Sequence, residues 1–311
     1  MSDSKFAFVF PGQGSQAVGM LGDFADNSVV TQTFEEASDV LGYDMWNLVS
    51  EGPAESLNET HRTQPALLTA STALWRVWCE NGPKPDFVAG HSLGEYSALV
   101  AAGSLEFAQG VKLVEQRGQF MQQAVPAGTG KMAAIIGLDD DAIKAACEEA
   151  AQGEVVSPVN YNSPGQVVIA GSAAAVERAM VACKEKGAKR ALPLPVSVPS
   201  HCSLMKPAAD SLAAVLESIE FQVPTIELIN NVDVAICNEQ QAIKEALIRQ
   251  LYSPVRWTES VQKLAASGVR KLIECGPGNV LSGLAKRIDR SLESSQISKK
   301  ESIEQIVKEL S

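Results

Sequence analysis

The sequence predicts an α/β protein in which a parallel-sheet core carries a smaller inserted unit. Short apolar segments alternate with amphipathic helical segments over most of the 311 residues, a pattern typical of a parallel sheet covered by helices. Between residues 127 and 198 the order changes to strand, helix, strand, strand, helix, strand, which is the split ferredoxin-like (βαββαβ) arrangement. We therefore predict a large domain formed by residues 1–126 and 199–311 and a small domain formed by residues 127–198.

In the first part of the large domain, an apolar run at residues 6–10 ends at Pro11-Gly12 and predicts a buried parallel strand. A second short strand is expected at residues 87–89. Helices are expected over residues 33–41, 65–79, 93–102 and 105–124, because each segment is long, apolar on one face and bounded by Gly or Pro.

The small domain begins with a strand at residues 132–136. Asp139 supplies an N-cap for a helix that buries Ile143, Ala146, Cys147 and Ala150. Strands at residues 155–161 and 166–170 flank a hairpin turn, a second helix ends at Gly187, and a last strand covers residues 191–196. After Pro199 the large domain resumes with helices at residues 204–219, 240–251 and 258–266 and strands at residues 226–229 and 271–274. The strand at residues 271–274 is expected to be the last.

The composition excludes several classes of protein. Hydrophobic residues make up 45% of the chain, so an ordinary globular core is expected. A net charge of −11 argues against binding to nucleic acid and to an anionic membrane surface. No secretory signal pattern and no apolar run of about 18 residues is present. Six cysteines without metal-ligand spacing predict reduced thiols, no bound metal and a cytoplasmic location.

The pentapeptide from Gly90 to Gly94 reads GHSLG and matches the G-x-S-x-G nucleophile elbow, with a strand before it and a helix after it. This context makes the parallel core α/β-hydrolase-like and predicts Ser92 as a nucleophile, the alternative being a tight structural turn. The amide of Leu93 would then face an oxyanion formed at Ser92.

A serine nucleophile needs a base, and the chain holds three histidines. His91 shares the tight turn with Ser92, so its side chain is expected to point away from the serine. His61 lies among Thr and Arg residues, in a predicted polar loop, and is expected at the surface. His201 follows Pro199-Ser200 in a stiff loop and is the predicted base, while the neighbouring Cys202 is expected to be a buried small residue.

The first glycine-rich turn, which begins at Pro11, nominally matches a dinucleotide-binding fingerprint. The required acid about twenty residues further on would be Glu35 or Glu36, but both stand in a helical segment, so no cofactor is expected. We instead predict that this turn is a loop in which the amide of Gln13, together with that of Leu93, faces an oxyanion.

Taken together, the motifs resemble those of the malonyl-CoA:acyl carrier protein transacylases, whose related domains occur in fatty acid and polyketide synthases. The resemblance runs in order from Phe6 to about Leu284. The motifs that carry it are PGQGSQ from Pro11, TQPAL from Thr63, GHSLGEYSAL from Gly90, Arg117, NYNSPGQ from Asn160, VPSHCSLM from Val198 and RQLYSPVRW from Arg249.

The resemblance implies a two-step transfer. Ser92 attacks the malonyl thioester with His201 as base, coenzyme A leaves, and the phosphopantetheine thiol of acyl carrier protein takes the malonyl group. The amides of Gln13 and Leu93 form the oxyanion hole. A main-chain carbonyl at Gln250 orients the imidazole in place of a third acid.

Arg117 separates the reaction classes. From the sequence alone, Arg117 shares a helix with Glu115 and would be a solvated surface residue. The resemblance instead implies that its guanidinium binds the free carboxylate of malonate. It also places Gln64, Asn160 and Asn162 near the site, where they either contact it or tie loops together.

Ser200 leaves acyl selectivity open, because Phe before the active histidine accompanies malonyl choice in synthase domains and Ser accompanies methylmalonyl choice. Malonyl is implied by the whole pattern instead.

Two alternative functions remain: a serine esterase or phospholipase-type hydrolase, and a non-catalytic carrier-docking subunit. We expect a monomer. Candidate carrier-docking cations are Lys184, Lys186, Lys189, Arg190, Lys286, Arg287 and Arg290.

Overall fold

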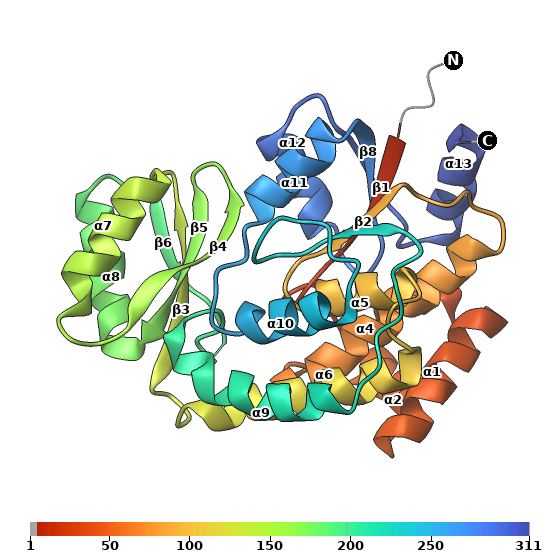
Figure 1. Ribbon diagram of the computed structural model, residues 1–311, viewed down its shortest axis with the longest axis horizontal. Coiled ribbons are helices and arrows are strands. Elements are labelled where there is room, and N and C mark those ends of the chain that lie inside the picture. The colour runs from red at the N-terminus through yellow and green to blue at the C-terminus, as the bar shows by residue number, and fades with distance from the viewer. Residues whose placement is uncertain (1–4, 197, 311) are drawn as a thin grey trace.

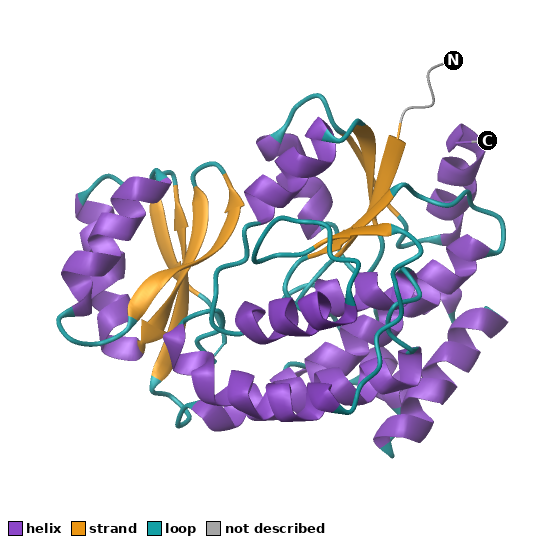
Figure 2. Ribbon diagram, viewed as in Figure 1, coloured by secondary structure: helices purple, strands orange, loops and turns teal. Residues whose placement is uncertain are grey.

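The structure is a computed structural model that describes residues 5–196 and 198–310. It contains two separate sheets, a five-stranded parallel sheet and a four-stranded antiparallel sheet (Figure 1). Helices lie on both sides of the larger sheet and on one side of the smaller sheet (Figure 2). The predicted α/β class with a parallel core is confirmed, and the polar residues 1–4 lie outside the described residues.

The larger sheet has its first strand at the centre. β1 (Lys5–Phe10) lies between β2 (Phe87–Gly90) and β8 (Val269–Glu274), while β7 (Glu227–Ile229) and β9 (Glu293–Gln296) form the two edges. All neighbouring strands run parallel. Because parallel strands end at one edge of a sheet, the loops after β1, β2, β7 and β8 converge there, which is where open α/β sheets place their binding sites.

Successive residues of β1 face opposite sides of the sheet. Phe6, Phe8 and Phe10 pack into the larger hydrophobic core, whereas Ala7 and Val9 pack into a smaller core on the other face. This strand is therefore buried on both faces, as its continuous apolar run predicts. The larger core is covered by α1 (Ser28–Leu41), α4 (Thr60–Cys79), α5 (Gly94–Ala101), α6 (Phe107–Ala124) and α9 (Lys206–Glu217), and the smaller core by α11 (Trp257–Ala266) and α12 (Val280–Ile288).

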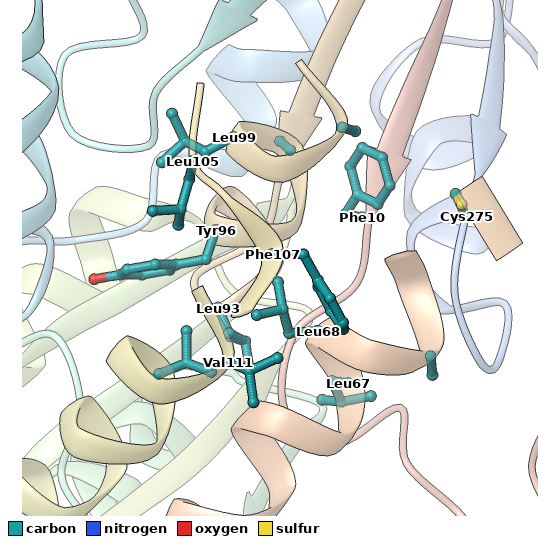
Figure 3. Packing of buried hydrophobic residues seen from close by; sticks show 14 of the residues in the cluster. Phe10, Leu67, Leu68, Leu93, Tyr96, Leu99, Leu105, Phe107, Val111 and Cys275 are labelled. Atoms are coloured by element: carbon teal, nitrogen blue, oxygen red, sulfur yellow. The ribbon is translucent and has the colours of Figure 1, made fainter. Parts of the chain in front are cut away.

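Figure 3 shows the part of the larger core where α5 meets α4 and α6. Leu93, the residue that caps the N-terminus of α5, lies in this cluster with Leu67, Leu68, Phe107 and Val111. Leu93 is 1% exposed. Its side chain therefore anchors the turn between β2 and α5 in the core.

The small domain has the predicted element order. β3 (Gly130–Ile136), α7 (Asp140–Ala151), β4 (Val156–Ser163), β5 (Gln166–Ser172), α8 (Ala173–Glu185) and β6 (Arg190–Pro193) follow one another. The sheet order β4-β5-β3-β6, with every pair antiparallel, is ferredoxin-like. Asp139 caps α7 by accepting from the N–H of Ala142, and the predicted apolar stripe of α7 packs against α8.

The structure differs from the sequence-based prediction mainly at the ends of the chain and of its elements. The strand at residues 271–274 is not the last, because β9 follows it and pairs with β8. β9 reads ESSQ and lies at the sheet edge, so it carries no apolar signal. The last small-domain strand ends at Pro193 rather than at residue 196, and α4 begins at Thr60, with Pro65 inside the helix. Helices that the sequence analysis missed are α2 (Met45–Glu51), α3 (Ala54–Leu57), α12 and α13 (Lys300–Leu310).

The remaining helix of the large domain, α10 (Gln240–Gln250), ends at a residue that enters the site described below. None of the helices in the described part of the chain is long and apolar enough to span a bilayer.

Candidate active site

The candidate site lies where three strands of the parallel sheet end. Gln13 follows β1, Ser92 follows β2, and Asn231 follows β7. A cavity of about 100 Å³ opens at this edge, between the two domains. It is lined by Gln13, Thr60, His91, Ser92, Leu93, Arg117, Met121, Met132, Asn160, Leu194, Val196, Val198, Ser200 and His201.

The predicted strand–turn–helix elbow is confirmed, and its geometry explains its glycines. Ser92 has φ 52°, in the left-handed region that non-glycine residues rarely adopt. A Cβ at Gly90 would lie 1.8 Å from the carbonyl carbon of Gly94, and a Cβ at Gly94 would lie 2.0 Å from the carbonyl oxygen of Phe10. The backbone of α5 therefore approaches β1 and β2 more closely than any side chain permits.

His201 lies directly against Ser92. Its Nε2 is 2.7 Å from Ser92 Oγ, and its Nδ1 is 2.7 Å from the main-chain oxygen of Gln250. Because a carbonyl only accepts, Nδ1 carries the proton and Nε2 is left to accept from the serine hydroxyl. The imidazole is thus oriented by the main-chain group that the resemblance implied, and no carboxylate takes part.

Burial sets the charge of this imidazole. His201 is 3% exposed. Burial, and then the nearby positive charge of Arg117, lower the pKa of His201 from 6.5 to about 3. The ring is therefore neutral around pH 7 and is able to accept the serine proton.

Two backbone amides are free to bind an oxyanion. Neither the N–H of Gln13 nor that of Leu93 donates to an acceptor within residues 5–196 and 198–310. The N–H of Ser92, in contrast, is already bonded to Oδ1 of Asn231 at 2.8 Å. The loop carrying Gln13 lies against the elbow, since a Cβ at Gly12 would lie 2.5 Å from the carbonyl oxygen of His91.

Arg117 is buried, contrary to what its sequence context alone suggested. It is 1% exposed and projects from α6 into the cavity beside Ser92. Nη1 donates to Oε1 of Gln64 at 2.7 Å, and Nη2 donates to Oε1 of Gln250 at 2.9 Å and lies 3.5 Å from Ser92 Oγ. No carboxylate in the described part of the chain pairs with it, and its buried Nε has no partner. The guanidinium is also 5.4 Å from the ring centre of Tyr96.

A buried acid that the sequence analysis missed lies behind these groups. Oε2 of Glu95 accepts from Nε2 of Gln250 at 2.9 Å and from the N–H of Asn231 at 3.0 Å. Burial raises the pKa of Glu95 to about 7, against the opposing effect of these hydrogen bonds. Two signals in the sequence pointed to this cluster: one acid in the apolar helix after the elbow, and polar Asn230-Asn231 directly after a predicted strand of the parallel sheet.

The two predicted asparagines lie on β4 of the small domain. Asn162 Oδ1 is 2.7 Å from Nε2 of His91, so it ties the small domain to the elbow. Asn160 lines the cavity, and its buried Oδ1 has no partner within the described residues. His91 bonds Asn162 and packs against Trp257, so it does not contact Ser92 Oγ as a base would.

The structure also shows where His61, Cys202 and Ser200 lie. His61 lies in the first turn of α4, not in a loop, and its Nδ1 is 2.9 Å from Oε1 of Gln122. Cys202 is buried, with Sγ 3.1 Å from the main-chain oxygen of Pro199. Ser200 lines the cavity. Within the described residues, no cluster of three or more His, Cys, Asp or Glu side chains is placed to hold a metal ion.

Comparisons with known proteins agree with this geometry. Residues 7–310 match the acyl transferase domain family. The malonyl CoA-acyl carrier protein transacylase of Escherichia coli is 65% identical over 296 residues, 94% of this chain and 96% of that protein. The Bacillus subtilis protein of the same name is 49% identical over 309 residues, 99% of this chain and 98% of that protein.

Solved structures are equally similar. An acyl carrier protein S-malonyltransferase from Vibrio cholerae superposes with TM-score 0.95 at 67% identity, covering 97% of this chain and 100% of that one. A malonyl-transacylase in complex with a type II polyketide synthase acyl-carrier protein gives TM-score 0.97 at 61% identity, covering 98% and 100%. The chain therefore belongs to the acyl transferase family, among its malonyl-CoA:acyl carrier protein transacylases, as its ordered motifs predicted.

Proposed function

We infer that this chain is an [acyl-carrier-protein] S-malonyltransferase. It moves the malonyl group from malonyl-CoA to the phosphopantetheine thiol of acyl carrier protein and so supplies extender units for fatty acid biosynthesis. The identity with named relatives supports this function, and so does the fold it shares with a malonyl-transacylase bound to its carrier protein. Coenzyme A enters as part of a substrate, and the reaction requires no bound cofactor.

The chemistry follows from the site geometry. The Oγ of Ser92 attacks the thioester carbon while Nε2 of His201 takes its proton. The carbonyl oxygen becomes negative and is held by the amides of Gln13 and Leu93. Coenzyme A then leaves as a thiol, with the proton from His201. In the second half, Nε2 of His201 takes the proton of the carrier thiol, the sulfur attacks the acyl carbon of malonyl-Ser92, and Ser92 Oγ leaves with the proton returned by His201.

The surroundings of Arg117 support malonyl as the acyl group. Arg117 is a buried cation beside the nucleophile, held by the neutral carbonyl oxygens of Gln64 and Gln250 instead of by an acid. A buried charge without a counterion is costly, so this arrangement favours a ligand that brings its own carboxylate. Malonate does so, whereas the ester of a simple esterase does not. The hydrogen-bonded Ser92–His201 pair argues against a non-catalytic docking subunit.

The carrier-docking surface is proposed around the β4–β5 turn. Arg190 and Gln166 both pair in register with Ile136, and Arg287 of α12 donates to Oε1 of Gln166 at 2.8 Å. Both arginines are exposed, and only β3 separates Arg190 on β6 from Gln166 on β5, so the two cations lie at the same end of the small sheet. By contrast, Lys186 is paired with Glu149 at 3.1 Å, so we assign it no docking role.

The proposal has three further parts: oligomeric state, location and domain division. A monomer is proposed, because Ser92, His201 and Arg117 already form a connected site without a second copy. The acidic composition and the absence of a bilayer-spanning helix in the described part of the chain fit a cytoplasmic enzyme. The division into residues 1–126 with 199–311 and residues 127–198 is proposed because each part builds one sheet, and β3–β6 with α7 and α8 enclose a core of their own.

Labelled malonyl-CoA tests the function directly. We expect a malonyl-enzyme that survives denaturation and passes its label to added carrier protein, and no label on Ser92→Ala, because the attacking hydroxyl is gone. Rapid release of free malonate would indicate a hydrolase, and an unlabelled wild-type protein would indicate a docking subunit.

Arg117→Ala should invert the acyl preference. Leaving the malonyl carboxylate unpaired in a buried site costs about 2–5 kcal/mol, a loss of roughly 30- to 4,000-fold in malonyl transfer. Acetyl-CoA has no free carboxylate and should lose little. Acylation rates with both thioesters measure the ratio, with Lys112→Ala on the exposed side of the same helix as the matched control. Equal losses for both substrates would make Arg117 a structural residue.

His201 should stay neutral well below pH 6.5. With its pKa lowered to about 3, native His201 binds fewer protons than the unfolded chain between pH 6.5 and 3. Its contribution to stability is therefore present above pH 6.5 and is lost as the pH falls through that window. Imidazole ¹⁵N NMR, assigned with a His201→Gln variant, should show a neutral ring at pH 5. A charged His201 at pH 5 would refute the assigned environment.

Reversing a docking charge should weaken binding of the carrier protein more than binding of malonyl-CoA. Arg190→Glu and Arg287→Glu should raise the apparent KM for acyl carrier protein, more at low than at high salt, because surface charges act mainly on association. KM for malonyl-CoA should change less. Lys144→Glu, at an exposed position on α7, is the control. Carrier kinetics unchanged in both arginine variants would exclude this surface.

A further inference from the structure

The side chain of Asn231 clamps the turn that carries the nucleophile. Its Nδ2 donates to the carbonyl oxygen of Gly90 at 2.6 Å, and its Oδ1 accepts from the N–H of Ser92 at 2.8 Å. One carboxamide thus holds the backbone on both sides of His91. Asn231 is fully buried.

This contact begins where strand pairing stops. β2 pairs with β7 as far as Ala89 opposite Ile229, and β2 then turns sharply into the elbow. Backbone groups at the elbow can no longer pair with a straight neighbouring strand, yet buried N–H and C=O groups need partners. The carboxamide of Asn231, just beyond the end of β7, offers one donor and one acceptor in place of that strand.

Asn231 is itself held at its other polar groups. Its N–H donates to Oε2 of Glu95 at 3.0 Å, and its carbonyl oxygen accepts from the N–H of Arg256 at 3.2 Å. Because the carbonyl of Gly90 only accepts and the amide of Ser92 only donates, a single orientation of the carboxamide satisfies both. The carboxamide of Asn231 is therefore held in one orientation.

Such a clamp is needed because the turn is strained. A non-glycine residue in the left-handed region costs on the order of 1–3 kcal/mol and persists where its surroundings over-determine it. Ser92 at φ 52° is such a residue. The clamp also occupies the N–H of Ser92, which leaves the amides of Gln13 and Leu93 as the free donors near Oγ.

We propose that Asn231 is the positioning residue of the nucleophile: its carboxamide holds the elbow so that Ser92 Oγ faces both His201 and the acyl carbon. This inference rests on the proposed function, in which Ser92 attacks the thioester. It assigns Asn231 no contact with the substrate. Its loss should therefore slow acylation by every thioester equally, unlike the loss of Arg117.

The experiment compares Asn231→Ala with Asn230→Ala. Asn230 is a matched control because it is also buried and bonds within the same loop, to Asp233 and Cys237, without reaching the elbow. A displacement of the reacting group by about 1 Å costs on the order of 100-fold in rate. We expect single-turnover acylation by malonyl-CoA and by acetyl-CoA to fall about 100-fold alike in Asn231→Ala, with KM unchanged, while Asn230→Ala stays near the wild-type rate.

Unfolding by denaturant shows whether the two variants lose similar stability. If Asn231→Ala does not fold, Asn231→Asp carries the test: it keeps the volume and the acceptor for Ser92 but places an oxygen against the carbonyl of Gly90, so the same equal loss is expected. A folded Asn231 variant with a near-wild-type rate, a loss matched by Asn230→Ala, or a loss for malonyl alone would overturn the proposal. Failure of the wild-type protein to form a malonyl-enzyme would instead refute the proposed function.

Discussion

The close approach of three backbone segments is the constraint on which this active site depends. The carbonyl oxygen of Phe10 lies where a Cβ of Gly94 would stand, and the start of α5 fills the space beside Gly90. Because β1, β2 and α5 touch through backbone atoms, the turn between them is forced to be tight, and Ser92 is raised at its tip. The same contact brings the loop after β1 against the elbow, where the amide of Gln13 is free beside that of Leu93.

Burial gives the groups around this turn their chemistry. His201 is kept neutral because its desolvated ring lies near a permanent cation, and its proton is fixed at Nδ1 by the carbonyl oxygen of Gln250. Arg117 remains charged and is surrounded by amide oxygens, so its attraction for a carboxylate is not cancelled by a bonded acid. Glu95 accepts a hydrogen bond from Gln250, and Gln250 accepts one from Arg117, so the side chain of Gln250 lies between the acid and the guanidinium.

Gln250 connects these groups in space. Its main-chain oxygen orients the base, its side-chain oxygen accepts from Arg117, and its side-chain nitrogen donates to Glu95. Since a guanidinium only donates, Arg117 fixes the side-chain oxygen of Gln250 toward itself, which leaves the amide nitrogen to donate to Glu95. Base orientation and carboxylate recognition thus share one residue at the end of α10, which links acylation chemistry to acyl selectivity.

The sequence by itself determined the parallel core, the element order of the small domain and the reacting pair, but it did not indicate β9 or the helices α2, α3, α12 and α13. Apolar periodicity and the elbow glycines are local patterns, and they predicted the parallel core, the ferredoxin-like unit and Ser92; the choice of His201 among three histidines also followed from the sequence. Tertiary structure alone decided whether Arg117 is buried. Its helix, α6, also carries polar residues, and Arg117 is buried because α6 packs against α4 and this side chain points into the cavity. It also decided the roles of Glu95 and Asn231, whose partners lie more than a hundred residues away along the chain. Local sequence patterns indicate which face of a segment is buried. The order of the strands in the sheet, in contrast, decides which distant backbone group a side-chain amide contacts.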